Sequence, residues 1–335
     1  MEFYASFASQ NEFIGLSLVA LGLGVGILSG LLGVGGGVLM TPALHLLGMP
    51  MPIAVGTTLT QMMASSLTAS IRHYRSKNLS IKLALAFALP AFVGVHVGKK
   101  LLVYWQSLEL ADQYSGLFYT VLLFYMGVVM LRRQRLQSGS TVSAPRFHRL
   151  RFFRSMLASS PSFTVYNPQA TGGSDAMIKV AATIPVSIGT GVGLVSSLTG
   201  LGGGFFYVPA MLNLLGLSMR VAVGTSVGTV FFGSIIGALS FGLEGLVDYT
   251  VALVLAVGSA IGGYLGAIAT RYVKGQSIRY LFILLVLSAS ASMGLNLLHY
   301  KFMANLLLFS ASSLVVLLAV TNAAYHFWAE RKNAS

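Results

Sequence analysis

Long apolar segments follow one another along almost the whole chain and are interrupted once, near the middle, by a polar stretch. They lie at about 13–32, 38–48, 53–71, 83–102 and 116–131, and after the polar stretch at about 177–199, 205–216, 221–243, 249–270, 280–298 and 302–328. A helix that crosses a membrane needs about 20 mostly apolar residues. The pattern therefore predicts an all-α polytopic membrane protein.

Two of these segments, 38–48 and 205–216, are too short to cross a membrane as helices. Both directly follow a run of glycines. We therefore expect each of them to be the return arm of a hairpin, or one half of a broken helix.

The glycine runs belong to a sequence repeat. GVGGG at 33–37 is followed by PA at 42–43 and AVGTT at 54–58, and GLGGG at 200–204 is followed by PA at 209–210 and AVGTS at 222–226. The offset is 167 residues from Gly33 to Gly200 and 168 residues from Ala54 to Ala222, half the chain. A duplicated, glycine-broken apolar segment indicates a transporter whose substrate site lies at the breaks.

The repeat divides the chain into four parts. These are a first transmembrane repeat (1–131), a basic cytoplasmic linker (132–176), a second transmembrane repeat (177–298), and an additional C-terminal transmembrane helix with its tail (299–335). Each repeat is predicted to hold a glycine-broken hairpin followed by three transmembrane helices.

Charge supports a membrane location. Only 9% of the residues are charged, against about 25% in soluble domains. The net charge of +13 suits cytoplasmic loops and anionic lipid rather than nucleic acid. Within the arginine-rich linker, aromatic residues interleave with arginines over 146–157, which predicts a basic amphipathic helix on anionic lipid. The alternative is a solvated linker.

The loop charges also bear on topology. If each broken segment returns to the side it came from, the two repeats are inverted, and the basic loops near 72–82 and 271–279 join the linker in the cytoplasm. The acidic loop at 244–248 then lies outside, and Lys99 and Lys100 are misfits. If instead the first segment of each half crosses fully, the repeats are parallel and the 271–279 loop lies outside. The charges favour inverted repeats.

The glycines offer a way to bind an anion without charged side chains. An unwound run exposes backbone N–H groups, and a helix that starts after it adds a partial positive charge. The predicted substrate-binding backbone is Gly35, Gly36, Gly37, Gly202, Gly203 and Gly204. The alternative is that these glycines only allow helices to pack closely.

Polar side chains follow the glycines in each repeat. Thr57, Thr58, Thr225 and Ser226 begin the next predicted helix, and their hydroxyls either cap it or donate to an anion. Gln61 lies one turn further on, where the second repeat has Thr229, and is a candidate specificity residue.

The positions of the titratable groups and the absence of cysteine limit the possible transport mechanisms. All eight acidic residues lie at ends or in loops, so a buried carboxylate relay is not expected. His45 is a possible proton-linked group, or else a structural histidine. There is no cysteine and no enzyme motif, and we expect neither a cofactor nor a metal site.

The doubled G-[LV]-G-G-G…P-A with the following A-V-G-T-[ST] resembles the TauE/SafE family of membrane permeases. The resemblance is good over about 25–105 and 190–270 and implies transport of small sulfur oxyanions and organosulfonates such as sulfite; other members are linked to carboxylates. The absence of cysteine argues against a thiol relay.

The sequence thus predicts a bacterial inner-membrane transporter that exports a small anion, sulfite or an organosulfonate, from a site between two glycine-rich hairpins. The alternatives are an anion channel, an uptake permease for sulfur oxyanions or small carboxylates, and a membrane scaffold that docks a partner through the linker. The pattern leaves the oligomeric state open.

Overall fold

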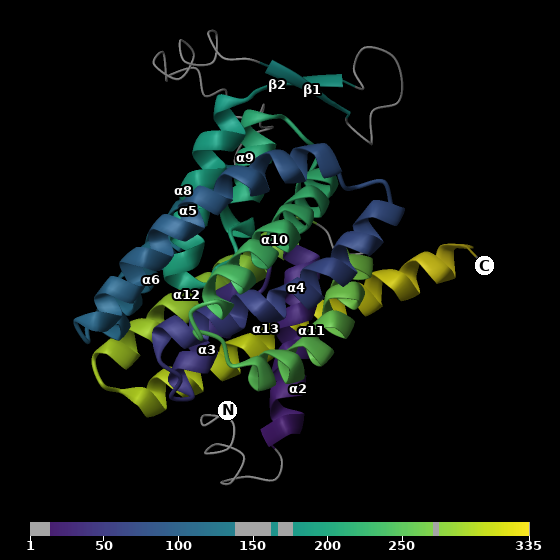
Figure 1. Ribbon diagram of the computed structural model, residues 1–335. Helices are drawn as coiled ribbons and strands as arrows, with labels where there is room; N and C mark the ends of the chain where they lie inside the picture. Colours follow the sequence, from purple (N-terminus) through teal and green to yellow (C-terminus); the bar gives the residue numbers. More distant parts are fainter. Residues whose placement is uncertain (1–13, 138–161, 167–176, 271–274, 335) are drawn as a thin grey trace.

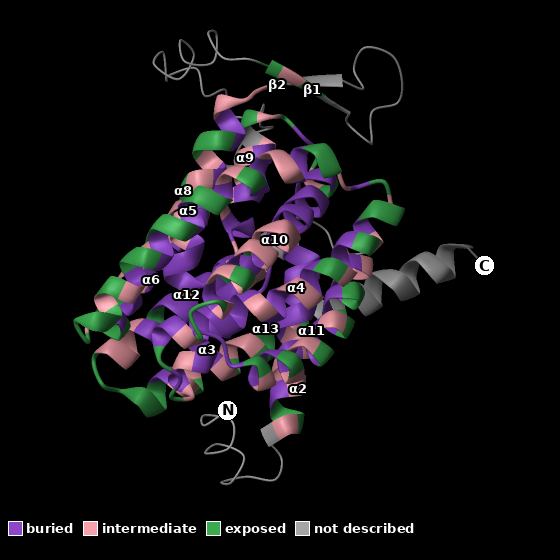
Figure 2. Cartoon of the chain, in the orientation of Figure 1, coloured by how far each residue is buried: buried purple, intermediate pink, exposed green. Residues whose placement is uncertain are grey.

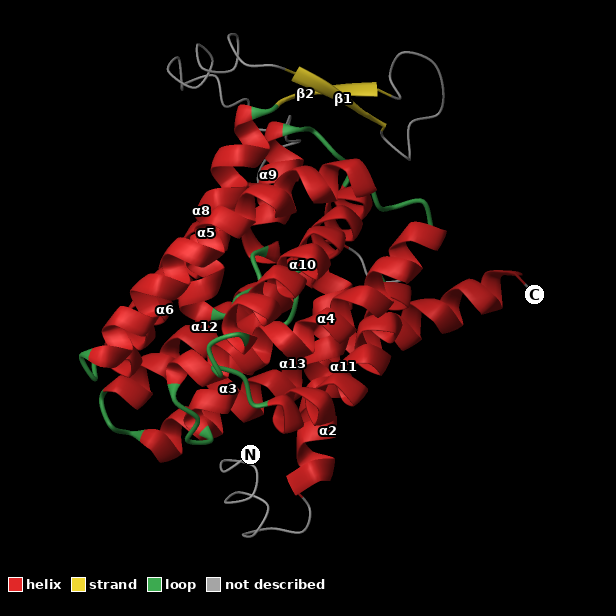
Figure 3. Ribbon diagram, viewed as in Figure 1, coloured by secondary structure: helices red, strands yellow, loops and turns green. Residues whose placement is uncertain are grey.

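The fold was examined in a computed structural model, which describes residues 14–137, 162–166, 177–270 and 275–334. Apart from one short pair of strands, its regular structure is helical (Figures 1 and 3). The first-half helices are α2 (Ile14–Leu32), α3 (Gly37–Leu46), α4 (Met51–Arg75), α5 (Ile81–Ser107) and α6 (Ala111–Gln137). Those of the second half are α8 (Thr183–Thr199), α9 (Gly204–Leu214), α10 (Met219–Gly242), α11 (Tyr249–Ala269), α12 (Gly275–Leu297) and α13 (Lys301–Ala334).

The prediction of an all-α polytopic membrane protein is confirmed. Among the described residues, seven helices are long and apolar enough to cross a membrane, namely α2, α5, α6, α10, α11, α12 and α13. α4 is as long as these but richer in Ser and Thr, and its polar residues are largely buried inside the protein (Figure 2). Burial against other helices lets this segment carry polar groups that lipid would not accept.

The two short segments form short helices, as the sequence predicts. α3 has 10 residues and α9 has 11, and each begins directly after a glycine N-cap, Gly36 or Gly203. Pro42 and Pro209 lie in corresponding places within them. Both helices are too short to span the apolar core of a membrane.

Each half of the chain packs against the other through matching helices. α2 lies along α11, and α8 lies along α5. Gly22, Gly26 and Gly30 of α2 face Leu255, Ser259 and Gly263 of α11 so closely that added Cβ atoms would overlap main-chain atoms. The residue numbers rise together, so α2 and α11 run in the same direction.

The α5–α8 pair is built in the same way, with Gly94 of α5 against Thr190 and Gly193 of α8 against Ala91. Small residues at spacings of four allow helices to approach this closely in membranes.

The corresponding helices α4 and α10 pack on each other in the interior (Figure 2). Gly56 of α4 contacts Phe241 of α10, and His73, near the other end of α4, contacts Gly224 near the start of α10. Residue numbers rise in one helix as they fall in the other. α4 and α10 therefore run in opposite directions.

The end of the linker and the first residues of the second repeat form structure that the sequence pattern did not predict. β1 (Ser162–Tyr166) pairs antiparallel with β2 (Met177–Ala181), with Phe163 opposite Val180. The segment predicted as helix over 177–199 is therefore helical only from Thr183, because its first five residues, which include the strand formers Ile178 and Val180, pair with β1 instead. The predicted lipid-binding helix at 146–157 lies outside the described residues.

Candidate functional site

The two glycine loops meet in the buried interior. A Cβ atom added to Gly37 would overlap the carbonyl oxygen of Gly200, and one added to Gly204 would overlap the carbonyl oxygen of Gly33. Only glycine fits there, because it has no side chain. The loops therefore pack directly on each other, and each short helix begins against the loop of the other half.

The loops share one backbone conformation. The sequence pattern predicts positive φ angles at these glycines, and the structure has them at matching positions: 74° at Gly33, 85° at Gly35 and 78° at Gly36, against 72° at Gly200, 71° at Gly202 and 80° at Gly203. Residues with a Cβ atom adopt this region at a cost. Gly37 and Gly204, by contrast, are already the first residues of α3 and α9.

The starts of α3 and α9 present unpaired backbone donors. Neither Gly36 nor Gly203 has a side chain that caps the helix. Within the part of the chain that the structure describes, no hydrogen bond engages the N–H groups of Gly36 and Gly37 or of Gly203 and Gly204. The first N–H groups of a helix lack acceptors inside it and carry partial positive charge. An anion is the complementary ligand.

The space beside the loops is filled by two side chains. Added Cβ atoms at Gly35 and Gly202 would both overlap or press on Met62 of α4, and the one at Gly35 also meets Val230 of α10. Met62 and Val230 are counterparts in the two repeats, at an offset of 168. In this conformation an apolar pair, rather than an anion-sized cavity, adjoins Gly35 and Gly202.

The hydroxyls of Thr57 and Thr225 hold loops of the opposite half. Thr57 Oγ1 accepts a hydrogen bond from the N–H of Asp248 at 3.0 Å, just before α11. Thr225 Oγ1 accepts from the N–H of Ser80 at 3.1 Å, just before α5. These hydroxyls thus fix the loop 244–248 and the loop 76–80 by equivalent bonds.

Thr58 and Ser226 occupy equivalent positions but differ in their bonds. Ser226 Oγ donates to the carbonyl oxygens of Gly33, at 2.8 Å, and Gly204, at 3.3 Å. It therefore ties the two glycine loops together. Thr58 Oγ1 is buried and has no hydrogen-bond partner among the described residues.

Gln61 is fully buried, and neither atom of its side-chain amide has a hydrogen-bond partner among the residues described. It lies one turn after Thr57 on α4, next to Met62. Met62 contacts both glycine loops, so α4 brings Gln61 within one residue of the loop crossing along the chain.

Three histidines differ in their burial and in the groups that they contact. His45 Nδ1 lies 3.0 Å from the carbonyl oxygen of Met49, a bond within the α3–α4 turn. His96 is exposed and stacks on Phe92. His73, near the end of α4, is buried, with Nε2 3.4 Å from the carbonyl oxygen of Gly30.

Comparison with known proteins decides the family. The family model for the sulfite exporter TauE/SafE matches residues 18–293, which include both glycine loops. The chain belongs to the TauE/SafE family.

The relatives are named as transporters. YunE of Bacillus subtilis (strain 168), a probable membrane transporter protein, is 27% identical over 269 residues, 78% of this chain and 90% of its own length. YdhB of the same organism, also a probable membrane transporter protein, is 26% identical over 72% of this chain and 85% of its own. Sulfite exporter TauE/SafE family protein 6 of Arabidopsis thaliana is 31% identical over 35% of this chain and 28% of its own. No solved structure matches the chain significantly.

Two residues of this TauE/SafE chain, Tyr119 and Asp112, support the site without any sequence signal. Tyr119 of α6 donates to the carbonyl oxygen of Val38 at 2.6 Å, at the start of α3. Asp112 Oδ1 accepts from the N–H of Met51 at 2.7 Å, at the start of α4. Both contacts join residues far apart in sequence, so no local pattern announces them.

Lys99, a misfit in the charge analysis, is ion-paired. Its Nζ lies 2.7 Å from Glu244 Oε1 and donates to the carbonyl oxygen of Ser240 at 3.0 Å. The Lys99 side chain is 5% exposed and that of Glu244 is 41% exposed. Pairing with Glu244 explains how a lysine is buried there.

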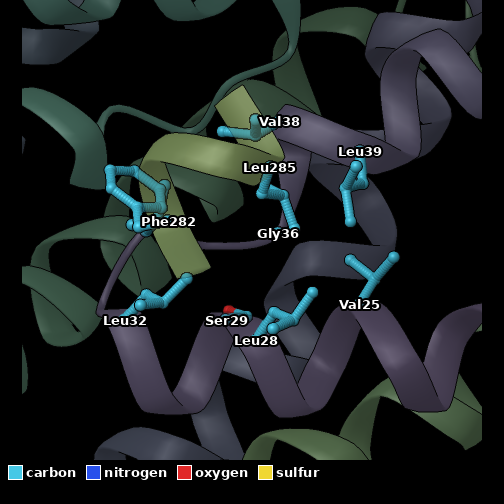
Figure 4. A pocket seen from close by; sticks show the side chains of 10 residues that line it. Val25, Leu28, Ser29, Leu32, Gly36, Val38, Leu39, Phe282 and Leu285 are labelled. Atoms are coloured by element: carbon cyan, nitrogen blue, oxygen red, sulfur yellow. The ribbon is translucent and has the colours of Figure 1, made fainter. Parts of the chain in front are cut away.

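A small pocket adjoins the first glycine loop (Figure 4). Residues of α2, α3 and α12 line it, together with Gly36, and Ser29 is its one hydroxyl-bearing lining residue. Its cavity volume is about 10 Å³, room for about one water molecule at most. The pocket is too small for an oxyanion, so this conformation of the TauE/SafE chain is closed next to Gly36.

Proposed function

We propose that the chain exports a small anion, sulfite or an organosulfonate, across the bacterial inner membrane. The observation that carries this is the pair of buried helix starts at Gly37 and Gly204, whose unpaired N–H groups adjoin the crossing of the two loops. The family to which the chain belongs is named for sulfite export, and relatives such as YunE are named as probable membrane transporters.

The proposed anion contacts come from both loops. They are the backbone of Gly35, Gly36, Gly37, Gly202, Gly203 and Gly204, with the hydroxyls of Thr57, Thr58, Thr225 and Ser226 and the amide of Gln61. Because Met62 and Val230 fill the space beside the loops, an anion enters only when the two halves move apart. Alternating access by one half rocking against the other supplies that movement.

We infer that the two halves are inverted repeats. The antiparallel arrangement of α4 and α10 supports this, since these helices occupy corresponding places in the two repeats. The exchanged pairs α2 with α11 and α8 with α5 are what a pseudo-two-fold axis produces.

The direction of the helices also gives the orientation of the protein in the membrane. α4 and α11 begin together, where Thr57 bonds Asp248, and are still in contact further on, where Thr68 bonds the carbonyl oxygen of Ala260. They therefore run in the same direction, and the basic loops that follow them lie on one side. By the positive-inside rule that side is the cytoplasm, with the linker.

The driving force requires no carboxylate relay. An inside-negative potential of about 100 mV favours expulsion of one negative charge by about 2.3 kcal/mol. Proton coupling through His45 or through the substrate is the alternative. Export would then follow the anion gradient and the membrane potential together.

The test is efflux from proteoliposomes loaded with sulfite, sulfoacetate, thiosulfate or lactate. Gly36→Ala and Gly203→Ala place a Cβ atom at positive φ beside Val25 or Val192, so both variants should transport at least tenfold more slowly than wild type. Gly233→Ala is the matched control, because an added Cβ there meets no atom within 4 Å.

Equal transport by all three variants would contradict the loop site, and no efflux of any of the four anions by wild type would contradict the function. Counterflow separates a carrier from a channel, because only a carrier exchanges internal for external substrate.

A further inference from the structure

Four buried side chains near the glycine loops have polar atoms without partners. Among the described residues, no hydrogen bond is made by the hydroxyls of Ser29, Thr41 and Thr58 or by either amide atom of Gln61, and each residue is at most 1% exposed. A buried polar group without a partner loses its bonds to water and gains nothing in return. Such groups in a native fold require an explanation.

All four belong to the first half. Their counterparts in the second half are Ser196, Val208, Ser226 and Thr229. Ser196 accepts from the N–H of Gly202 at 3.0 Å, Ser226 bonds both loops, and Thr229 donates to the carbonyl oxygen of Thr225 at 3.0 Å. Val208 is apolar. At each of these positions the second half therefore has either a hydrogen-bonded hydroxyl or an apolar side chain, whereas the first half has an unpaired polar group.

Two of the four residues lie at the loop crossing, and the other two lie on α4 within about one turn of Met62. Thr41 Oγ1 lies where a side chain at Gly200 would be, and the Cβ of Ser29 adjoins Gly36. Thr58 lies one turn before Met62, which contacts both loops, and Gln61 lies within the same turn. The unpaired hydroxyls of Ser29 and Thr41 therefore lie at the same crossing as the unpaired N–H groups of α3, and Thr58 and Gln61 lie close along α4 to Met62, which contacts both loops.

We infer that the side-chain groups still free to bind the substrate beside the two loops come from the first half, and that the substrate is a monoanionic oxyanion that still carries an O–H group, such as hydrogen sulfite. This inference rests on the proposed function and deepens it. The Thr41 and Thr58 hydroxyls and the Gln61 amide nitrogen donate to the anion's oxygens, and Gln61 Oε1 accepts its O–H.

The charge of the neighbourhood favours one negative charge over two. Residues 1–71 contain no Lys or Arg. The positive ends of α3 and α9 each supply about half a unit charge, together enough to offset a monoanion but only about half of a dianion. A sulfonate has the right charge but no O–H for Gln61 Oε1.

The experiment measures melting temperatures of the purified full-length protein in detergent, with sulfite at acidic and at alkaline pH, methanesulfonate, or sulfate. Wild type should be stabilised most by sulfite at acidic pH and least by sulfate. Thr41→Val and Gln61→Leu should weaken sulfite binding at least tenfold without lowering the melting temperature of the anion-free protein. Thr229→Val is the matched control and should bind as wild type does.

Each contrary outcome points to a different error. Variants that melt higher but keep the sulfite response would show that the groups hold water only. Variants that melt lower without anion would show a structural role. If wild type effluxes sulfite in proteoliposomes and both variants do so equally well, this inference fails while the proposed function stands.

Discussion

Ser226 joins the two halves at the loop crossing through a single hydroxyl. It donates to Gly33 of one loop and Gly204 of the other. Ser226→Ala would remove both bonds and leave buried carbonyl oxygens underpaired, so we expect a loss of stability on the order of 1–2 kcal/mol. Thermal unfolding in detergent measures it. Ser310→Ala, which removes an exposed local bond, is the control, and equal melting of the two variants would contradict the role of Ser226.

The same residues show what a sequence can and cannot predict about a site. Positive φ at the glycines follows from composition alone, because few other residues adopt it. The partner of Thr57 does not, because Asp248 lies 191 residues away and is brought near only by packing. Thr58 and Ser226 look equivalent in sequence, yet one is unpaired and the other bonds both loops.

The contact between α2 and α11 depends on glycine at one face of each helix. A Cβ atom at Gly26 would meet main-chain atoms of Ser259, whereas one at Gly24 meets only Val316 Cγ2, at 3.5 Å. We expect Gly26→Ala to destabilise by about 1–3 kcal/mol through overpacking. Gly24→Ala should be neutral or slightly stabilising, because alanine favours helix. Size-exclusion chromatography after graded heating distinguishes them, and similar behaviour of both variants would refute the close contact.

The apolar pattern predicted the positions of those helices that face lipid, because the thickness and apolar nature of the membrane fix the length and hydropathy of such helices. It predicted the short helices α3 and α9 from their length. It missed β1 and β2, since five-residue strands in a polar linker have no comparable constraint. It also did not indicate that α4 lies in the interior, where neighbouring helices rather than lipid surround its polar residues.

The loops 76–80 and 244–248 cover opposite ends of the molecule's central helix pair in equivalent ways. Asn78 contacts Gly224 of α10, and Leu246 contacts Gly56 of α4. In addition to its threonine bond, the loop 244–248 is held by the ion pair of Lys99 and Glu244. The counterpart of Glu244 in the loop 76–80 is Ser76, which has no charge. The two loops are therefore alike in their threonine bonds and differ in that the loop 244–248 also takes part in this ion pair.

This asymmetry predicts which end opens when the ion pair is broken. Glu244→Gln leaves the buried Lys99 charge without its partner, which is destabilising, so the loop 244–248 should open more often. Because the chain has no cysteine, Leu246→Cys provides a single reporter thiol at a buried position within that loop. An impermeant maleimide should label it several-fold faster in the Glu244→Gln background.

Reversing the pair with Lys99→Glu and Glu244→Lys should restore slow labelling of Leu246→Cys. Glu109→Gln, which removes the same charge elsewhere, should leave the labelling rate unchanged. Labelling that is equally fast in every background would mean that the ion pair does not hold the loop closed.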